Sequence, residues 1–293
     1  MTLWTTISEH IAQTKGTPFM ARQQRSTGGG CINRTFVIDD GHAAFFVKIN
    51  QADKLGMFQA EAAGLTAILS SNSLRAPAPI CHGVAEDQAY LAMEYIPLQS
   101  GDNASAQDMG LKLAQMHRNT AGQFGWEIDN NIGSTPQINT WAQDWISFFG
   151  TQRLHYQLDL AQANGCPLLS LGEQLIELLP AFFDNKNPEP SLLHGDLWGG
   201  NWGADPEEKA VIFDPALYYG DRETDLAMTE LFGGFPPRFY AAYKDSYPID
   251  ANGYAVRKIL YQLYHILNHF NLFGGAYADQ ARQMIQRSLA EVR

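Results

Sequence analysis

The chain reads Leu192-Leu193-His194-Gly195-Asp196-Leu197-Trp198-Gly199-Gly200-Asn201 and, shortly afterwards, Val211-Ile212-Phe213-Asp214-Pro215. Two apolar runs each deliver an aspartate, and a glycine-rich turn follows the first of them. Asn201 lies five positions after Asp196, and Asp214 lies 18 positions after it. The alternative is a plain turn between two buried strands, with Asp and Asn as turn residues, but three separate spacings would then agree by accident.

This layout is similar to the catalytic loop and metal-binding strand of protein kinases. In that template an aspartate takes the proton of the acceptor hydroxyl, an asparagine five residues later binds one metal ion, and a later aspartate binds both. Asp196 is therefore the candidate base, and Asn201 and Asp214 are the candidate Mg2+ ligands. Magnesium favours a few protein oxygens, with phosphates and waters completing its shell. Gly195 and Pro215 depart from the template, which has Arg and Phe at these positions.

Composition limits the class of protein. The 293 residues are 45% hydrophobic and 17% charged, which is typical of an ordered globule of one large or two small domains. A net charge of −11 argues against a general partner among nucleic acids or anionic membranes. No apolar run approaches the ~18 residues that span a bilayer, and the start has no signal-peptide pattern. Cys31, Cys81 and Cys166 form no CxxC pair, which predicts a reduced, cytoplasmic protein.

The first half predicts a nucleotide-binding lobe. A short helix over 3–13 precedes strands within 18–49. Backbone N–H groups of a glycine-rich turn can cover phosphates, although an ordinary hairpin turn is the commoner case for an isolated triplet. A lysine that ends a strand more often points to solvent. The order of a glycine-rich hairpin, a strand with a lysine and a helix with a glutamate favours the kinase interpretation. These candidates are Gly28, Gly29, Gly30, Lys48 and Glu61.

A helix over 53–70, capped by Asp53, would carry Glu61 inward to pair with Lys48. A hairpin over 80–95 follows, and its end is the expected hinge between two lobes. Backbone groups in a hinge bind adenine without a side-chain signature, so this prediction depends on the order of the elements. The candidate hinge residues are Met93, Glu94, Tyr95 and Ile96.

The second half predicts a helical lobe. A capping box of Ser105 and Asp108 would begin a helix that ends at His117, a residue expected to be buried and hydrogen-bonded. Residues 121–140 predict an unusually long loop, and Asp225 predicts a helix cap that braces the catalytic loop. Further helices are expected at 140–163, 168–185, 236–246, 254–273 and 276–291. The predicted fold class is α+β and two-lobed, with lobes at 1–97 and 98–293.

With these elements in place, the segment from His194 to Asn201 resembles the fructosamine (ketosamine) kinase family, a relative of aminoglycoside and choline kinases within the protein-kinase-like fold. The Leu-Trp pair after Asp196 distinguishes this family from generic aminoglycoside phosphotransferases. Gly199 is a departure, because serine is frequent there. The resemblance covers nearly the whole chain, and its other segments are Gly28-Gly29-Gly30-Cys31-Ile32-Asn33, Phe46-Val47-Lys48, Glu61-Ala62-Ala63-Gly64-Leu65, Met93-Glu94-Tyr95, Thr135-Pro136-Gln137, Asp144-Trp145, Arg153-Leu154 and Asp221-Arg222-Glu223-Thr224-Asp225-Leu226-Ala227-Met228.

The resemblance implies an ATP- and Mg2+-dependent kinase that phosphorylates the 3-hydroxyl of ketoamines, as small molecules or on glycated proteins, in deglycation. It implies that Asp196 is the base, that Asn201 and Asp214 bind magnesium, and that Trp198 lies near the acceptor. Cys31 in the phosphate loop suggests an oxidation-sensitive thiolate, or else a small residue that merely fits the turn.

Two other functions stay open. An aminoglycoside- or choline-type small-molecule phosphotransferase would share the same catalytic residues. A nucleotide-binding pseudokinase scaffold would have lost its base or metal ligands, and none of these is missing here.

Overall fold

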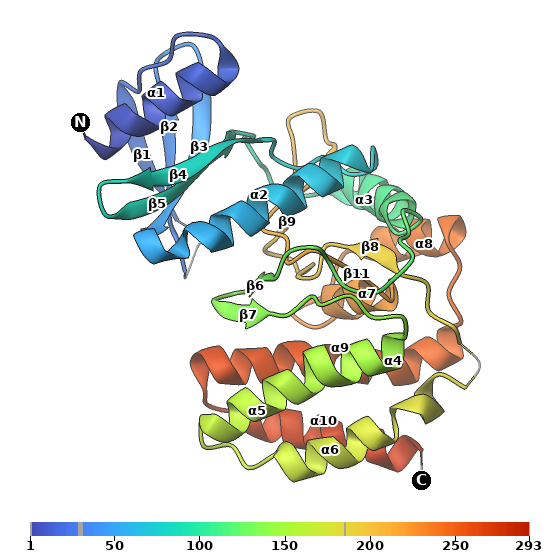
Figure 1. The fold of residues 1–293 in the computed structure, drawn as a ribbon. Coiled ribbons are helices and arrows are strands. Elements are labelled where there is room, and N and C mark those ends of the chain that lie inside the picture. The colour runs from blue at the N-terminus through green and yellow to red at the C-terminus, as the bar shows by residue number, and fades with distance from the viewer. Residues whose placement is uncertain (1, 29–31, 185, 293) are drawn as a thin grey trace.

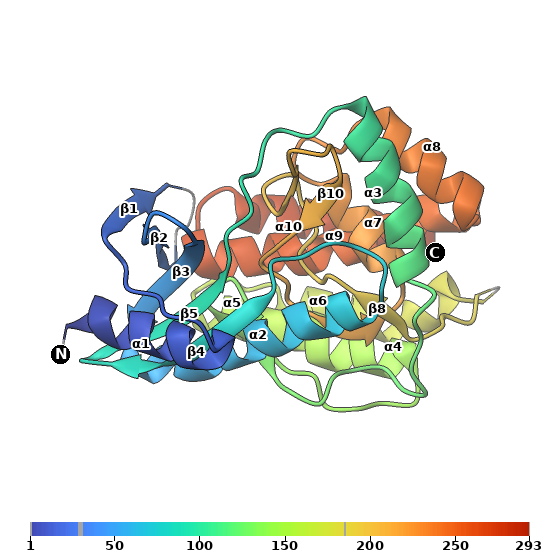
Figure 2. The same ribbon diagram turned by 90° about the horizontal axis from the view of Figure 1, so that it is seen from above.

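The computed structural model describes residues 2–28, 32–184 and 186–292. The chain forms a sheet with two helices and, below it in Figure 1, a larger and mainly helical part. Viewed from above in Figure 2, α2 runs alongside the sheet towards the helical part. The predicted α+β class is confirmed.

Five antiparallel strands in the order β1-β2-β3-β5-β4 form the sheet. Side chains alternate between the two faces of a strand, so Phe45, Val47 and Ile49 of β3 pack on one face with α1. Lys48 therefore points to the other face, where α2 lies. The bounds are α1 Leu3–Lys15, β1 Gln23–Thr27, β2 Arg34–Asp39, β3 Ala44–Gln51, α2 Leu55–Ser70, β4 Pro79–Ala85 and β5 Gln88–Glu94.

The segment between β5 and α3 (Asn103–Met116) connects the sheet to the helical part. Gln99 in this segment exchanges two backbone hydrogen bonds with Ala204, at 2.9 and 3.0 Å. The link is thus attached to the second part of the chain. The predicted lobe boundary between residues 97 and 98 falls within it and stays a prediction.

Helices surround three short strand pairs in the second part, β6–β7, β8–β11 and β9–β10. Its core is aromatic, with Trp145 packed on Phe148, Phe149 and Tyr261. The bounds are β6 Asn130–Ile132, β7 Thr135–Gln137, α4 Trp145–Phe148, a π-helix Phe149–His155, α5 Tyr156–Ala163, α6 Leu169–Glu177, β8 Ser191–Leu193, β9 Trp202–Ala204, β10 Ala210–Ile212, β11 Tyr218–Gly220, α7 Glu223–Thr229, α8 Pro237–Ser246, α9 Ala251–Phe273 and α10 Tyr277–Glu291.

Three predicted helix caps are wrong. Asp225 lies inside α7, whose N-cap position is Arg222, so its carboxylate does not cap that helix. Asp53 lies in a 3-10 turn, Ala52–Lys54, and caps nothing, because this turn feeds α2 directly. The capping box of α3 consists of Asp102 and Ser105, since Asp102 accepts backbone N–H groups at the helix start. Asp108 lies further along α3, where it forms an ion pair with Lys112 at 2.9 Å.

The region predicted as a loop over 121–140 contains the β6–β7 hairpin. Its amides hold neighbouring backbone: Asn130 Nδ2 donates to the Leu217 carbonyl at 2.8 Å, and Gln137 Nε2 donates to the Ala216 carbonyl at 3.0 Å. The expected helix over 140–163 begins later, at Trp145, and has a π-helical middle. Trp141, which precedes this helix, is 40% exposed and stacks on Tyr219.

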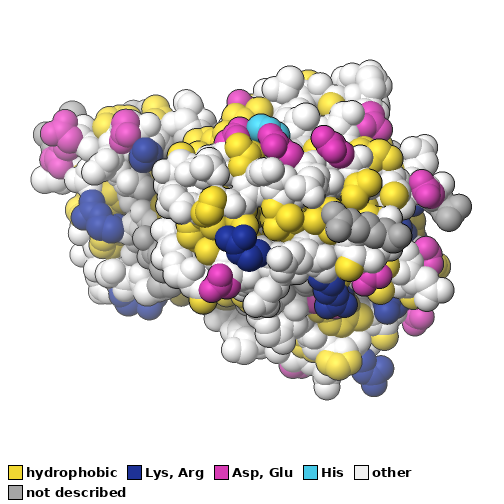
Figure 3. Space-filling view, turned by 90° about the horizontal axis from the view of Figure 1, so that it is seen from below, with side chains coloured by type: hydrophobic (Ala, Val, Ile, Leu, Met, Phe, Trp, Pro, Cys, Tyr) yellow, Lys and Arg dark blue, Asp and Glu magenta, His cyan; other side chains and the backbone are white. Residues whose placement is uncertain are grey.

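Among the helices of the described residues, none combines the length and apolar composition that crossing a membrane requires. Figure 3 shows one face of the molecule, on which lysine and arginine side chains are interspersed with acidic ones. Hydrophobic side chains lie between these charged groups, so neither sign of charge dominates this face.

Candidate active site

The catalytic loop leaves β8 through a turn that only glycine fits. Gly195 has a φ of +83°, and a Cβ on it would lie 2.0 Å from the Ala216 carbonyl oxygen. This explains why glycine replaces the arginine of the protein-kinase template, because the backbone at Ala216, before β11, passes too close for a side chain. The next residue, Asp196, is thereby placed at the open end of the β8–β11 pair.

Asp225 of α7 holds this turn from behind, as its position in the sequence predicted. Its carboxylate accepts the backbone N–H of His194 at 2.7 Å and of Gly195 at 2.9 Å. His117 lies 3.1 Å from the same carboxylate and is fully buried, as expected. Burial lowers the pKa of His117 more than Asp225 raises it, so the imidazole is neutral at neutral pH. The hydrogen bonds of Asp225 to the backbone of His194 and Gly195 hold the turn that leads into Asp196 in one conformation.

Asp196 and Asn201 face each other across the loop. Asn201 Nδ2 donates to the Asp196 carbonyl at 2.9 Å and to its carboxylate Oδ2 at 3.2 Å. Burial, and then the nearby charge of Asp214, raise the pKa of Asp196 to about 7. A carboxyl with such a pKa can accept a proton near neutral pH.

Asp214 lies beyond β10 in a strained conformation, with a φ of +58°. Non-glycine residues adopt this region at a cost and are often functional when they do. Its side chain is 48% exposed, and Oδ1 accepts Lys48 Nζ at 2.5 Å. No described residue donates to Asp214 Oδ2 or to Asn201 Oδ1. These free oxygens are the hard donors that magnesium prefers, so the residues fit such an ion.

Lys48 joins the two parts of the chain. Its ammonium lies 2.5 Å from Glu61 of α2 and 2.5 Å from Asp214, although only 5% of its side chain is exposed. Burial alone would lower the pKa of Lys48, but Asp214 and Glu61 raise it above its usual value. Lys48 is therefore charged, and the predicted pairing of Lys48 with Glu61 is present.

The predicted nucleotide-binding positions are only partly described. Gly28 has no atom within 4 Å of its Cβ position, whereas Gly29, Gly30 and Cys31 lie outside the described residues. Met93 and Glu94 end β5, and Tyr95 and Ile96 follow in the link.

The Glu94 carboxylate is engaged by a cation and cannot serve as a free ligand. It accepts Arg75 at 3.0 Å, and the same guanidinium binds Asp205 in the second part. Glu94 can therefore contribute to nucleotide binding only through its backbone.

Trp198 lies on the exposed side of the loop, with 39% of its surface accessible. Gly200 permits this, because a Cβ there would lie 2.4 Å from the Trp198 ring. Trp198 meets Phe232 edge-on at 6.4 Å, and Phe232 contacts His269 at 4.7 Å. Sequence reasoning missed Phe232 and His269, because Phe232 lies in the bend after α7, His269 lies on α9, and neither belongs to a motif.

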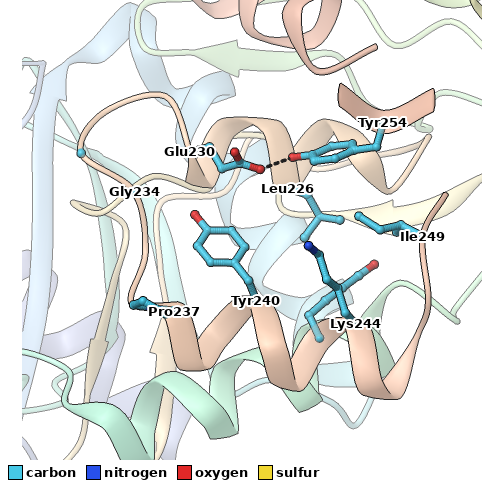
Figure 4. A pocket seen from close by; sticks show the side chains of 10 residues that line it. Leu226, Glu230, Gly234, Pro237, Tyr240, Lys244, Ile249 and Tyr254 are labelled. Carbon is cyan, nitrogen blue, oxygen red and sulfur yellow. Dashed lines mark hydrogen bonds between the residues drawn. The ribbon is translucent and has the colours of Figure 1, made fainter. Parts of the chain in front are cut away.

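A separate cavity of about 520 Å³ lies among α7, α8 and α9 (Figure 4). Tyr240, Lys244 and Tyr254 project towards it, and Tyr254 donates to Glu230 at 2.6 Å. None of the predicted site residues lines this cavity. It therefore takes no part in the site described above.

Comparison with known proteins bears on the whole chain. The family model described as fructosamine kinase matches residues 3–291. A probable ketoamine kinase of Synechocystis sp. is 47% identical over 98% of this chain and 97% of that protein. The chloroplastic protein-ribulosamine 3-kinase of Arabidopsis thaliana is 43% identical over 93% of this chain and 84% of that protein.

Two solved structures are also similar to this chain over nearly its whole length. The putative fructosamine-3-kinase of Haemophilus somnus has a TM-score of 0.89 and 30% identity, covering 97% of this chain and 96% of that one. An aminoglycoside phosphotransferase, APH(4)-Ia, solved with ADP and hygromycin B, has a TM-score of 0.63 and 16% identity, covering 97% of this chain and 99% of its own. The second likeness shows the fold alone, which is protein-kinase-like, as predicted.

Proposed function

The chain belongs to the fructosamine kinase family, and on that premise we propose that it transfers the γ-phosphoryl group of ATP to the 3-hydroxyl of ketoamines. The observation that carries the proposal is the contact of Lys48 with both Glu61 and Asp214, beside Asp196 and Asn201. This arrangement unites a phosphate-binding cation, metal-binding oxygens and a base from both parts of the chain.

Asp196 is the proposed catalytic base. The acceptor oxygen bonds to the γ-phosphorus while the bond from that phosphorus to the departing ADP oxygen breaks, and the hydroxyl proton passes to the Asp196 carboxylate. Because Asn201 binds Asp196 Oδ2, the other oxygen, Oδ1, is the one that faces the hydroxyl. The pKa of about 7 suits this proton transfer.

Asn201 and Asp214 are the proposed ligands of Mg2+, through the oxygens that no described residue engages. When bound, the ion neutralises negative charge on the phosphates. Lys48, held by Glu61, is proposed to bind the α- and β-phosphates, and the backbone of residues 93–96 is proposed to bind adenine. The glycine loop, Gly28 to Gly30, is proposed to cover the phosphates.

Trp198 is the proposed contact for the acceptor sugar, because its exposed ring stands two residues after the base. Phe232 and His269 continue the aromatic surface away from the reacting hydroxyl. Both free ketoamines and glycated proteins are proposed as acceptors, the latter because three relatives are named protein-ribulosamine 3-kinases. The cytoplasmic location stays a prediction.

The proposal is tested by ADP release with ribulose-, erythrulose- and fructose-amine adducts, beside an aminoglycoside and choline. We expect turnover with at least one ketoamine, and ³¹P NMR should place the phosphate on the third sugar carbon. Turnover with the aminoglycoside or choline alone would replace this function by the small-molecule phosphotransferase alternative. ATP binding without turnover on any acceptor would favour the scaffold.

A further inference from the structure

Arg153 is a fully buried cation that has no acidic partner among the described residues. Its guanidinium donates to the Ile138 carbonyl at 2.5 Å and to Asn139 Oδ1 at 2.7 Å, while Nε has no partner. A buried charge without a counter-ion is costly, so neutral residues usually take such a place. The structure must therefore gain something from this guanidinium that an apolar side chain would not supply.

Aromatic faces replace the missing carboxylate. The guanidinium carbon lies 4.1 Å from the centre of the Tyr218 ring and 4.6 Å from that of Phe148. Stacking of this kind stabilises a desolvated cation and fixes its plane. Arg153 also belongs to the π-helix Phe149–His155, and such interruptions of α-helices occur frequently at functional sites.

One chain of contacts leads from Arg153 to the segment after the metal ligand. Asn139, oriented by Arg153, donates to Asn130 Oδ1 at 3.1 Å. Asn130 in turn donates to the Leu217 carbonyl at 2.8 Å. Through these hydrogen bonds Arg153 orients the side-chain amides of Asn139 and Asn130. Asn130 in turn holds the backbone at Leu217, three residues after Asp214.

A second chain of contacts leads to the catalytic loop. Tyr218, whose face the guanidinium covers, is paired with Leu193 across β8 and β11. The edge of its ring lies 3.4 Å from the Cβ position of Gly195, the residue before Asp196. Because Tyr218 is paired with Leu193, a displacement of Tyr218 would be passed to the strand that leads into Gly195 and Asp196.

We propose that Arg153 is a positioning residue, which holds Asp196 and Asp214 at their working separation through Asn139 and the Tyr218 ring. This inference rests on the proposed kinase function. Arginine is required because only a planar guanidinium makes the stack and the fork of hydrogen bonds together. Lysine keeps the charge but loses both, and methionine keeps only volume.

The kinetic test compares Arg153→Lys and Arg153→Met with the wild type and with Arg257→Met. Arg257 is the matched control, because it is also buried but is paired with Glu223 at 2.8 Å and touches neither chain of contacts. We expect kcat to fall by roughly 10- to 100-fold in both Arg153 variants, because small displacements of catalytic groups cause losses of this size. The Kd for ADP measured without Mg2+ should change by less than about three-fold, because Lys48 and the backbone of residues 93–96 lie outside both chains of contacts.

Hydrogen–deuterium exchange supplies a readout that does not need the activity. In the Arg153 variants, amides of residues 192–197 and 215–219 should exchange faster, while those of α1 and α10 should not. In Arg257→Met the catalytic segments should keep their protection, and kcat per folded molecule should stay within about three-fold. If the wild type phosphorylates no ketoamine, the proposed function fails, but the exchange result still decides the role of Arg153.

The inference is overturned if the kcat loss in the Arg153 variants only follows the loss of folded protein, as in the control. It is overturned equally if exchange rises everywhere alike, or if kcat and exchange do not change. Should Arg153→Met not fold, Asn139→Ala interrupts the first chain of contacts and leaves the stack intact. It should then lower kcat by roughly three- to ten-fold, and an unchanged kcat would contradict the positioning role.

Discussion

The two sides of the catalytic loop differ in how they are built. Behind it, Asp225, His117 and His194 are buried and joined by hydrogen bonds to the backbone that carries Asp196. In front of it, Trp198 is 39% exposed and meets Phe232 edge-on. Buried, fully bonded groups have one arrangement, whereas exposed rings tolerate many shapes. The difference teaches that the backbone leading into Asp196 is held rigidly from behind, whereas the exposed face, the proposed acceptor surface, has room to adjust.

The largest expected effect comes from Asp196, the proposed base, which lies between the two sides. Asp196→Asn keeps the shape but removes the proton acceptor, so kcat should fall by ~10²–10⁴-fold. Binding of ADP, measured by calorimetry, should be retained. If Asp196→Asn kept its turnover, Asp196 would not be the base. The buried contacts of Asp225 and His117 behind the loop would then have no catalytic purpose.

The substitution Asp225→Asn weakens the buried support behind the catalytic loop. In the amide one of the two carboxylate oxygens becomes an NH2 group, which cannot accept a hydrogen bond. Either Gly195 N–H at the Oδ1 position, or His194 N–H and His117 at the Oδ2 position, then loses its acceptor, and the charge that strengthens all three contacts is lost. Loss of a hydrogen bond to a buried charge lowers the free energy of unfolding by on the order of 3 kcal/mol. Urea denaturation measures this loss. Asp159→Asn, an exposed carboxylate beside His155, is the control and should change stability by less than about 0.5 kcal/mol.

Lowering the pH should reduce the free energy of unfolding, because buried histidines such as His265 resist protonation in the folded state. Burial lowers the pKa of His265 to about 3, whereas an unfolded histidine has a pKa of about 6.5. Between these values the unfolded state binds an extra proton, so stability is full above pH 6.5 and falls as the pH drops. At pH 5 this amounts to about 2 kcal/mol. Melting curves between pH 7.5 and 5 measure it.

The same curves for two variants isolate the histidine responsible. In His265→Phe the dependence should be smaller by that amount. His42→Gln, at an exposed turn, should keep the dependence of the wild type. An unchanged slope in His265→Phe would assign the acid sensitivity to the other buried imidazoles.

The substitution Trp198→Ala tests the exposed aromatic surface in front of the catalytic loop. Of the four predictions it has the smallest expected change in free energy. The KM for a ketoamine should rise by roughly ten-fold, about 1.4 kcal/mol, because a stacking face for the sugar is lost. Melting temperature should not fall, since the ring is exposed. A fall in kcat with an unchanged KM would mean that Trp198 supports the loop rather than the acceptor.

Much of the site could be predicted because its residues lie at fixed spacings within one motif or one repeated order of elements. Lys48 and Glu61 were expected to pair because strand alternation and helix periodicity aim them at each other. Phe232 and His269 could not be predicted, since a contact between a bend and a helix far apart in the sequence leaves no local pattern. The caps at Asp53 and Asp108 failed because local capping rules cannot foresee a 3-10 turn or an earlier acidic residue.

The contact between Lys48 and Asp214 spans 166 positions of the chain. Ribosomes add ~5–20 residues per second, so Lys48 is made roughly 8–30 s before its second carboxylate exists. During that interval the emerging first part can pair Lys48 only with Glu61. The active site is therefore among the last features to be completed during biosynthesis, and a nascent chain shorter than this span has no means of transferring phosphate.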